Sequence, residues 1–158
     1  TVGVIGTRAT IASQRYQQRL TENGFKVVAL ATPLLASAIE EGFYDGAVSE
    51  ALLATYLEQN TFNDVDALIL GCTHYPLIAE QISDFLPETV EIINSAEVIA
   101  EAVAETIGKE ESSNGVAQPP RYVARQFLVS DLTISFAQSA QRFFGDEVEL
   151  EERNLWRL

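Results

Sequence analysis

Short apolar runs alternate with longer amphipathic runs along nearly the whole chain. The apolar runs are dense in Val, Ile, Leu and Ala and lack the regular polar alternation of a strand with one face in water. In the runs between them, apolar residues recur at the spacing of one helix face. Strands buried on both faces and joined by helices form parallel sheets. The alternation therefore predicts an α/β protein with a largely parallel sheet and flanking helices.

The glycines, prolines and capping residues between these runs set the expected bounds of each element. The helix over 47–60 is expected to place Val48, Leu52, Tyr56 and Leu57 on one face. Residues 109–120 are rich in Ser, Gly and Pro and are the one expected linker. Strands are expected at 2–6, 26–30, 67–71, 89–93, 122–129 and 147–150. Helices are expected over 7–24, 33–42, 47–60, 76–85, 96–108 and 132–143.

The charge balance narrows the classes of ligand. The net charge is −13, from 23 acidic against 10 basic residues, and this disfavours nucleic acid, whose phosphates need clustered Lys and Arg. Only Lys26 and Lys109 are available for a Schiff-base cofactor, so none is expected. One cysteine excludes an internal disulfide framework, and no apolar run has the length of a membrane helix. A cytoplasmic enzyme or binding domain, with no nucleic-acid or membrane partner, is expected.

Residues 71–76, GCTHYP, hold the only cysteine, Cys72, and the only histidine, His74. They follow the strand expected at 67–71, and ligands of parallel sheets bind at the carboxyl ends of strands. A following helix N-terminus would lower the pKa of Cys72, and its free N–H groups with the Thr73 hydroxyl could hold a carboxylate. Gly71 would let the backbone turn tightly beside a ligand. The alternative is a buried, inert cysteine and a histidine without a chemical role.

Metal and dinucleotide sites are not expected. Cys72 and His74 are two ligands where zinc takes three or four, and no ordering partner for a Cys-His hydrolase is evident. VIGTRATI lacks the full GxGxxG fingerprint of dinucleotide binding. Thr7 and Thr10 lie three positions apart there, so on a first helical turn their hydroxyls would face one side. Each is either a helix N-cap or a ligand contact.

LILGCTHYPLI at 68–78 closely resembles the second catalytic motif of glutamate racemase, of the aspartate/glutamate racemase superfamily. Further segments resemble the same family in the same order. They are VGVIGTRATIASQRY at 2–16, PLLASAIEEG at 33–42, VEIINSAEVIAEAV at 90–103 and LVSDLTISFAQSAQRFFG at 128–145. The resemblance implies a cofactor-independent isomerase of the cytoplasm that supplies D-glutamate for peptidoglycan, and so for cell-wall biogenesis and cell shape.

In that family two cysteines face each other across the α-carbon of glutamate, one removing a proton and the other returning one. The resemblance implies that Cys72 is one of them, on the L-glutamate face, that His74 assists it, and that Glu40 is an accessory charged residue. Substrate contacts are implied for Thr73, Thr7 and Thr10. Near Glu40 the family usually has cysteine at Thr32, phenylalanine at Leu35 and proline at Ser37.

The resemblance also implies two pseudo-symmetric α/β lobes with the site between them. Residues 1–93 would form most of the second lobe, and 94–158 the C-terminal part of the first, whose N-terminal strands are absent here. The family's other cysteine, beside Asn-Thr, is absent too, and the chain opens without methionine. We therefore expect the C-terminal portion of the enzyme, inactive alone and prone to self-association. Its partners would be glutamate and the missing N-terminal half, with a homodimer as a candidate assembly.

Two other interpretations remain open. One is a one-cysteine decarboxylase or isomerase of the same superfamily, and the other is a non-catalytic binding domain in which Cys72 is buried. Histidine two positions after the cysteine favours the glutamate type, because aspartate-type members usually carry glutamate there.

Overall fold

The computed structural model describes residues 1–58, 61–113, 126–145 and 148–153. The chain divides into two compact units, residues 1–113 and 114–158, and each is described by itself. None of the helices in the described ranges is long and apolar enough to span a membrane. The predicted lobe boundary between residues 93 and 94 stays a prediction.

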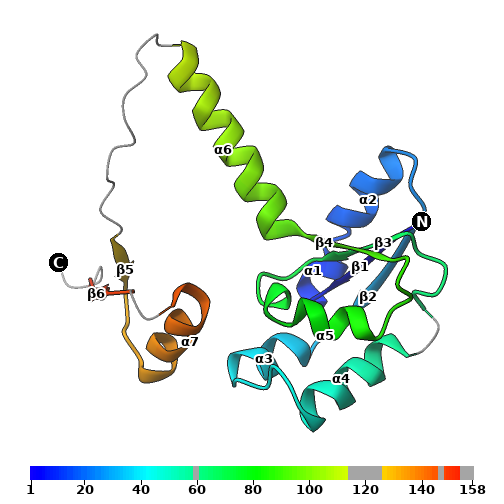
Figure 1. Cartoon of the computed structure of the whole chain (residues 1–158), viewed down its shortest axis with the longest axis horizontal. Helices are drawn as coiled ribbons and strands as arrows, with labels where there is room; N and C mark the ends of the chain where they lie inside the picture. The colour runs from blue at the N-terminus through cyan, green and yellow to red at the C-terminus, as the bar shows by residue number, and fades with distance from the viewer. Residues whose placement is uncertain (59–60, 114–125, 146–147, 154–158) are drawn as a thin grey trace. The chain divides into compact units, whose positions relative to one another are not determined.

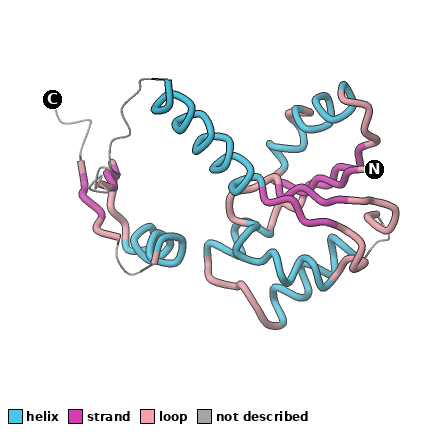
Figure 2. Tube along the Cα trace, turned by 45° about the horizontal axis from the view of Figure 1, so that its top comes forward, coloured by secondary structure: helices cyan, strands magenta, loops and turns pink. Residues whose placement is uncertain are grey.

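A parallel sheet forms the centre of the first unit (Figures 1 and 2). Its strand order is β2-β1-β3-β4, and every neighbouring pair is parallel, as the sequence predicted. All four carboxyl ends therefore meet at one edge of the sheet. The strands are β1 (Val2–Gly6), β2 (Val27–Ala31), β3 (Ala67–Leu70) and β4 (Glu91–Asn94).

Helices cover both faces of this sheet (Figure 1). The single helix predicted over 7–24 is wrong, because the chain breaks at Gln14, which takes a left-handed φ of 58°. The GCTHYP motif leads into a 3₁₀ turn before the next helix begins. The helical elements are α1 (Arg8–Ala12), α2 (Arg15–Glu22), α3 (Leu35–Glu40), α4 (Ala47–Leu57), η1 (Tyr75–Ile78), α5 (Ala79–Asp84) and α6 (Ser95–Ser113).

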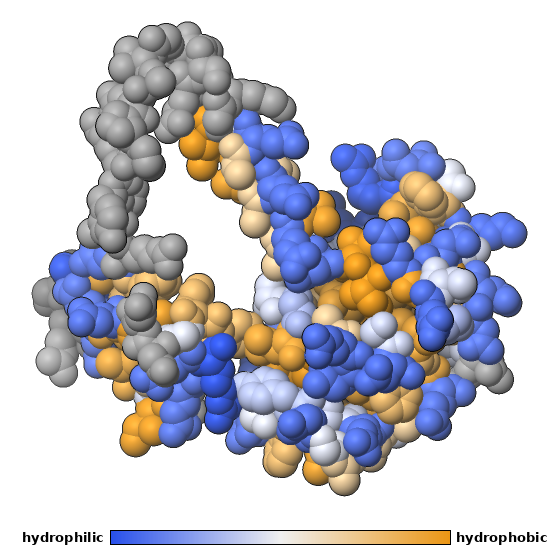
Figure 3. All heavy atoms as spheres, in the orientation of Figure 1, coloured by the Kyte–Doolittle hydropathy of each residue, from blue (hydrophilic) through white to orange (hydrophobic). Residues whose placement is uncertain are grey.

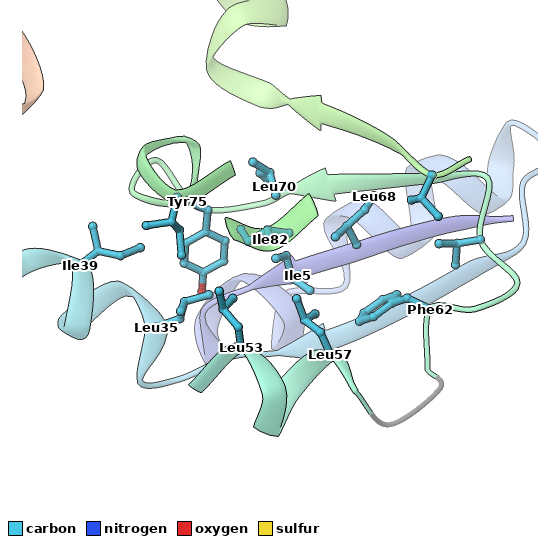
Figure 4. Packing of buried hydrophobic residues seen from close by; sticks show 13 residues of the cluster. Ile5, Leu35, Ile39, Leu53, Leu57, Phe62, Leu68, Leu70, Tyr75 and Ile82 are labelled. Carbon is cyan, nitrogen blue, oxygen red and sulfur yellow. The ribbon is translucent and has the colours of Figure 1, made fainter. Parts of the chain in front are cut away.

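The larger core lies on the sheet face covered by α3, α4, η1 and α5 (Figure 4). Ile5, Leu68 and Leu70 project from the central strands into it, and the Tyr75 ring lies among them with no exposed surface. On the other face, Val2, Val4 and Ile69 pack with partly buried side chains of α1 and α2. Burial on both faces explains why these strands are apolar without alternation. Each fully buried Leu or Ile contributes about 1.5–3 kcal/mol.

Helix α4 turns most of the predicted face to the core, because Leu57 is buried and Leu52 and Tyr56 pack partly buried against the core cluster. Its buried residues are Ser49, Leu53 and Leu57, whereas Val48 is 47% exposed. The Ser49 hydroxyl donates to the Tyr44 carbonyl at 3.2 Å, which satisfies the one polar group on this face.

Helix α6 continues through Gly108, where a helix end was predicted, and reaches Ser113. The predicted linker is therefore helical over 109–113, and 114–120 lies outside the described residues. Along α6, apolar and hydrophilic side chains lie side by side on the surface (Figure 3). Its exposed apolar side chains, each more than half exposed, are Val98, Ile99, Val103 and Ile107.

The second unit contains a short parallel pair, β5 (Phe127–Val129) and β6 (Leu150–Glu152), and helix α7 (Ile134–Phe144). Thr133 caps α7 by accepting a hydrogen bond from the Phe136 N–H at 3.2 Å. The rings of Phe127 and Phe144 lie 5.1 Å apart and join the helix to the pair. The first half of the strand predicted at 122–129, residues 122–125, lies outside the described residues.

Candidate active site

The carboxyl edge of the sheet gathers the residues that the sequence singled out. Thr7 follows β1, Thr32 follows β2 and Cys72 follows β3 after Gly71. The strand ends are tied together, since the Gly71 N–H donates to the Ile5 carbonyl at 2.8 Å. Ser95, at the end of β4, donates its hydroxyl to the Leu70 carbonyl at 2.9 Å. The edge is a continuous hydrogen-bonded platform for the GCTHYP turn.

Cys72, His74 and Glu40 form a relay on this platform. The Cys72 Sγ lies 3.6 Å from His74 Nδ1, and His74 Nε2 lies 3.0 Å from Glu40 Oε1. Glu40 is the last residue of α3, so tertiary packing of that helix delivers it to the motif. The His74 side chain is 23% exposed and that of Glu40 is 53% exposed, which leaves the relay open on one side.

This geometry allows a proton to move between sulfur and imidazole. A proton on Nε2, donated to the Glu40 carboxylate, leaves Nδ1 as the acceptor for the Cys72 thiol. Transfer of the thiol proton to Nδ1 gives a thiolate and an imidazolium, and the Glu40 carboxylate stabilises the imidazolium. The arrangement follows the nucleophile–base–orienting group logic of acid/base sites.

The pKa of Cys72 is raised above its ordinary value, not lowered as the sequence predicted. Burial is the largest cause, and the Glu40 charge raises the pKa further. Hydrogen bonds from the His74 and Tyr75 N–H groups lower the pKa of Cys72, but by less than burial and the Glu40 charge raise it. The expected helix field is missing, because the motif enters a 3₁₀ turn and α5 begins only at Ala79. At neutral pH the unliganded site therefore presents a protonated thiol, suited to donating a proton.

Thr7 and Thr10 lie side by side, as their spacing predicted, with their hydroxyl oxygens 3.0 Å apart. Thr7 also caps α1, accepting the Thr10 N–H at 3.2 Å, so the capping interpretation is confirmed for Thr7. Thr73 is exposed beside Cys72. Contact of these threonines with a ligand stays a prediction.

Gly71 is required by packing rather than by a tight turn. It does not share the positive φ of Gly24, Gly42, Gly46 and Gly145. A Cβ atom there would lie 2.7 Å from the Ile5 carbonyl oxygen, closer than real contacts allow. The close approach of β1 and β3 therefore excludes any side chain at this position.

A buried pair of hydroxyl groups, not predicted from the sequence, joins the Tyr75 side chain of the GCTHYP motif to Thr32, which follows β2. The hydroxyl oxygens of Thr32 and Tyr75 lie 2.6 Å apart, with Thr32 1% exposed and Tyr75 fully buried. The available signals were the place of Tyr75 within GCTHYP and of Thr32 directly after a strand. Burial raises the pKa of the Tyr75 phenol to about 12, although the Thr32 hydrogen bond opposes the rise.

This raised pKa predicts an alkaline loss of stability. Folded Tyr75 holds its proton more tightly than unfolded Tyr75, so its contribution is complete below about pH 10 and is lost as pH rises through about 12. The loss amounts to at most about 2.7 kcal/mol, from 1.36 kcal/mol for each pKa unit. We expect Tyr75→Phe to remove this part of the fall in unfolding free energy, measured by urea denaturation from pH 9 to 12. An unchanged fall in the variant would contradict the burial of an ionisable phenol.

No group of three or more His, Cys, Asp or Glu side chains that could hold a metal ion occurs within the described part of the chain. The relay itself offers a thiol, an imidazole and a carboxylate, all of which can take part in acid/base chemistry.

The profile of the Asp/Glu/Hydantoin racemase family matches residues 1–103. The glutamate racemase of Syntrophus aciditrophicus is 34% identical over 154 residues, which cover 96% of this chain and 56% of that protein. The glutamate racemase of Chlorobium phaeobacteroides is 35% identical over 158 residues, with the same coverage of both chains. The chain thus spans about half the length of the curated relatives it matches.

Solved structures of glutamate racemases are also similar to this chain. Glutamate racemase from Francisella tularensis, crystallised in complex with D-glutamate, superposes with a TM-score of 0.81 at 32% identity, covering 96% of this chain and 57% of that one. The RacE1 isoform from Bacillus anthracis gives a TM-score of 0.79 at 33% identity, covering 98% and 57%. With a family profile that covers well over half of the residues, the chain belongs to the Asp/Glu/Hydantoin racemase family.

Proposed function

We propose that this chain supplies one of the two acid/base groups of a glutamate racemase. The Cys72–His74–Glu40 relay at the carboxyl edge of a parallel sheet is the observation that carries the proposal. Relatives named glutamate racemase, one of them solved with D-glutamate, support the choice of substrate. The complete enzyme would interconvert L- and D-glutamate without a cofactor in the cytoplasm and supply D-glutamate for peptidoglycan.

Inversion at an α-carbon requires proton removal from one face and proton delivery to the other. On its face, the Cys72 thiol donates its proton to the carbanion and becomes a thiolate. In the other direction a thiolate is needed first, and the transfer of the thiol proton to His74 Nδ1 supplies it. The thiolate then takes the α-proton of L-glutamate. Glu40 stabilises the imidazolium while the thiolate exists.

Glutamate brings two carboxylates, which the site can meet without basic side chains. The paired hydroxyls of Thr7 and Thr10 would hold one carboxylate, and the exposed Thr73 with its N–H would hold the other. Hydroxyl and N–H donors bind anions through hydrogen bonds, so the acidic balance of the chain does not oppose this.

The second acid/base group would come from sequence outside these 158 residues, since Cys72 is the only cysteine here. The chain alone would then be inactive. Residues 94–158 would belong to the other lobe and pack with the N-terminal half of the enzyme. The exposed apolar side chains of α6, such as Ile99 and Val103, support burial against such a partner.

Two observations favour the alternatives. A single cysteine fits a decarboxylase or isomerase that protonates one face only. A thiol with a raised pKa fits a binding domain in which Cys72 has no chemical role. Native Cys72 that reacts with a thiol reagent only after unfolding would support the binding domain.

The deciding experiment uses the natural polypeptide that contains this chain, with its reading frame determined upstream of Thr1. L-glutamate and D-glutamate are incubated separately with it in D₂O. A racemase incorporates α-deuterium and drives both samples to zero optical activity. Exchange with retained configuration would point to a one-base enzyme, and absence of exchange from both enantiomers to a binding domain.

A further inference from the structure

A network of buried hydroxyl groups joins the ends of β1 and β2 to the GCTHYP motif, which follows β3. Besides its 2.6 Å contact with Tyr75, the Thr32 hydroxyl lies 3.3 Å from the Gly6 carbonyl, and the Thr32 N–H donates to the same carbonyl at 2.8 Å. The Tyr75 hydroxyl lies 3.3 Å from the Thr32 carbonyl. The end of β1, the end of β2 and the GCTHYP motif are therefore fastened at one buried point.

The same tyrosine contacts the Cys72 segment through its backbone. Its N–H donates to the Cys72 carbonyl at 3.2 Å, and the N–H groups of His74 and Tyr75 also face the sulfur. Figure 4 shows the Tyr75 ring among the core side chains, with its hydroxyl pointing toward Leu35. The Tyr75 ring is buried and its hydroxyl is bonded to Thr32, and the N–H of the same residue is one of the two amides that face the sulfur.

A space-filling role alone would not need these hydroxyls. Buried hydroxyls must find partners, whereas a valine and a phenylalanine of similar shape would fill the same space without that demand. The two hydroxyls come from segments 43 positions apart, so they specify one register between β2 and the motif.

We propose that Thr32 and Tyr75 are positioning residues that hold Cys72 Sγ in its half-buried place against His74 Nδ1. They touch no reacting atom and act through the backbone of residues 72–75. The use of the Cys72 thiol as an acid/base group rests on the proposed function. The placement of the thiol does not, and it is tested without measuring turnover.

The expected consequence concerns the thiol and the imidazole. Burial is the main cause of the raised pKa of Cys72, so a loosened motif should move the pKa down, toward its ordinary value. A loosened motif should also weaken the contact between Cys72 Sγ and His74 Nδ1, so that a chemical change at the sulfur affects the imidazole less. One cysteine and one histidine in the chain make both readouts specific to the site.

The test measures Cys72 alkylation by iodoacetamide against pH, and the His74 ring signals by NMR before and after alkylation, in the full 158-residue chain. Tyr75→Phe and Thr32→Val are each expected to lower the alkylation midpoint by about half a pH unit and to raise the rate at pH 8 about threefold. The change in His74 signals on alkylation should shrink in both. Thr32→Ser, which restores the hydroxyl, should behave like the wild type.

Ser49→Ala is the matched control, because Ser49 is also a buried hydroxyl, bonded to the Tyr44 carbonyl on the same sheet face but outside the Cys72 segment. If Ser49→Ala shifts the midpoint as much, general loosening is the cause and the proposal fails. Unchanged midpoints and His74 signals in Thr32→Val and Tyr75→Phe would overturn it as well. Thr32→Val keeps the Tyr75 bond to the Thr32 carbonyl, so this variant tests the proposal even if Tyr75→Phe does not fold. Absence of racemisation would refute the proposed function, but the alkylation and NMR measurements would still test the positioning role of Thr32 and Tyr75.

Discussion

Cys72→Ala is expected to abolish the proposed interconversion of L- and D-glutamate by the complete enzyme, with a loss of at least about 10³-fold in kcat. A methyl group cannot give or take a proton, and no second thiol exists in this chain to replace it. Glutamate binding should stay within a few-fold, because the proposed carboxylate contacts are threonine hydroxyls and backbone N–H groups. Circular dichroism of the substrate measures turnover, and calorimetry measures binding.

The same variant offers a test that separates the two faces of the substrate. With Cys72 absent, the proposed second base can still exchange the α-proton of D-glutamate with D₂O, whereas exchange of L-glutamate should stop. Ser49→Ala should retain both exchanges and serves as the control for folding. Retained racemisation by Cys72→Ala would overturn the acid/base role of Cys72, and loss of binding would show that the residue shapes the pocket.

Much of the fold could be predicted because burial on both faces leaves a direct trace in the sequence. The runs at β1 and β3 are apolar at nearly every position, and both are central strands. The errors fall where local cues and tertiary contacts disagree. Helix α6 passes Gly108, since an internal glycine costs only about 1 kcal/mol. The helix break at Gln14 could not be predicted, because no glycine or proline lies at that position.

In the candidate site, too, the features set by nearby residues could be predicted and those set by tertiary packing could not. Cys72 and His74 are two positions apart, so their proximity follows from the chain, whereas Glu40 reaches the motif only through the packing of α3. The direction of the Cys72 pKa was predicted wrongly, because the helix field was read from Pro76 while burial depends on the whole fold. The Thr32–Tyr75 pair was missed because no sequence pattern couples residues that far apart.

His74→Asn is expected to lower kcat about 10- to 100-fold in the complete enzyme, since assistance by one acid/base group is lost while Cys72 remains. The two enantiomers have equal free energy, so kcat/KM must fall equally in both directions and cannot reveal which face is affected. The evidence lies in the primary isotope effect. If His74 serves the Cys72 step, that step becomes more rate-limiting in both directions.

With α-deuterated L-glutamate, the isotope effect on kcat should therefore grow, because Cys72 is the group proposed to remove that deuteron. With α-deuterated D-glutamate it should shrink, because removal by the other base no longer limits the rate. Glu40→Gln is the companion variant: it keeps a hydrogen-bonding group beside Nε2 but removes the charge that raises the pKa of Cys72. Glu40→Gln should lower the pKa of Cys72 and should change the isotope effects of the two enantiomers in the same opposite directions, but by less than His74→Asn. Isotope effects that change equally for both enantiomers in His74→Asn would show that His74 supports the fold of the motif rather than the proton transfer of Cys72.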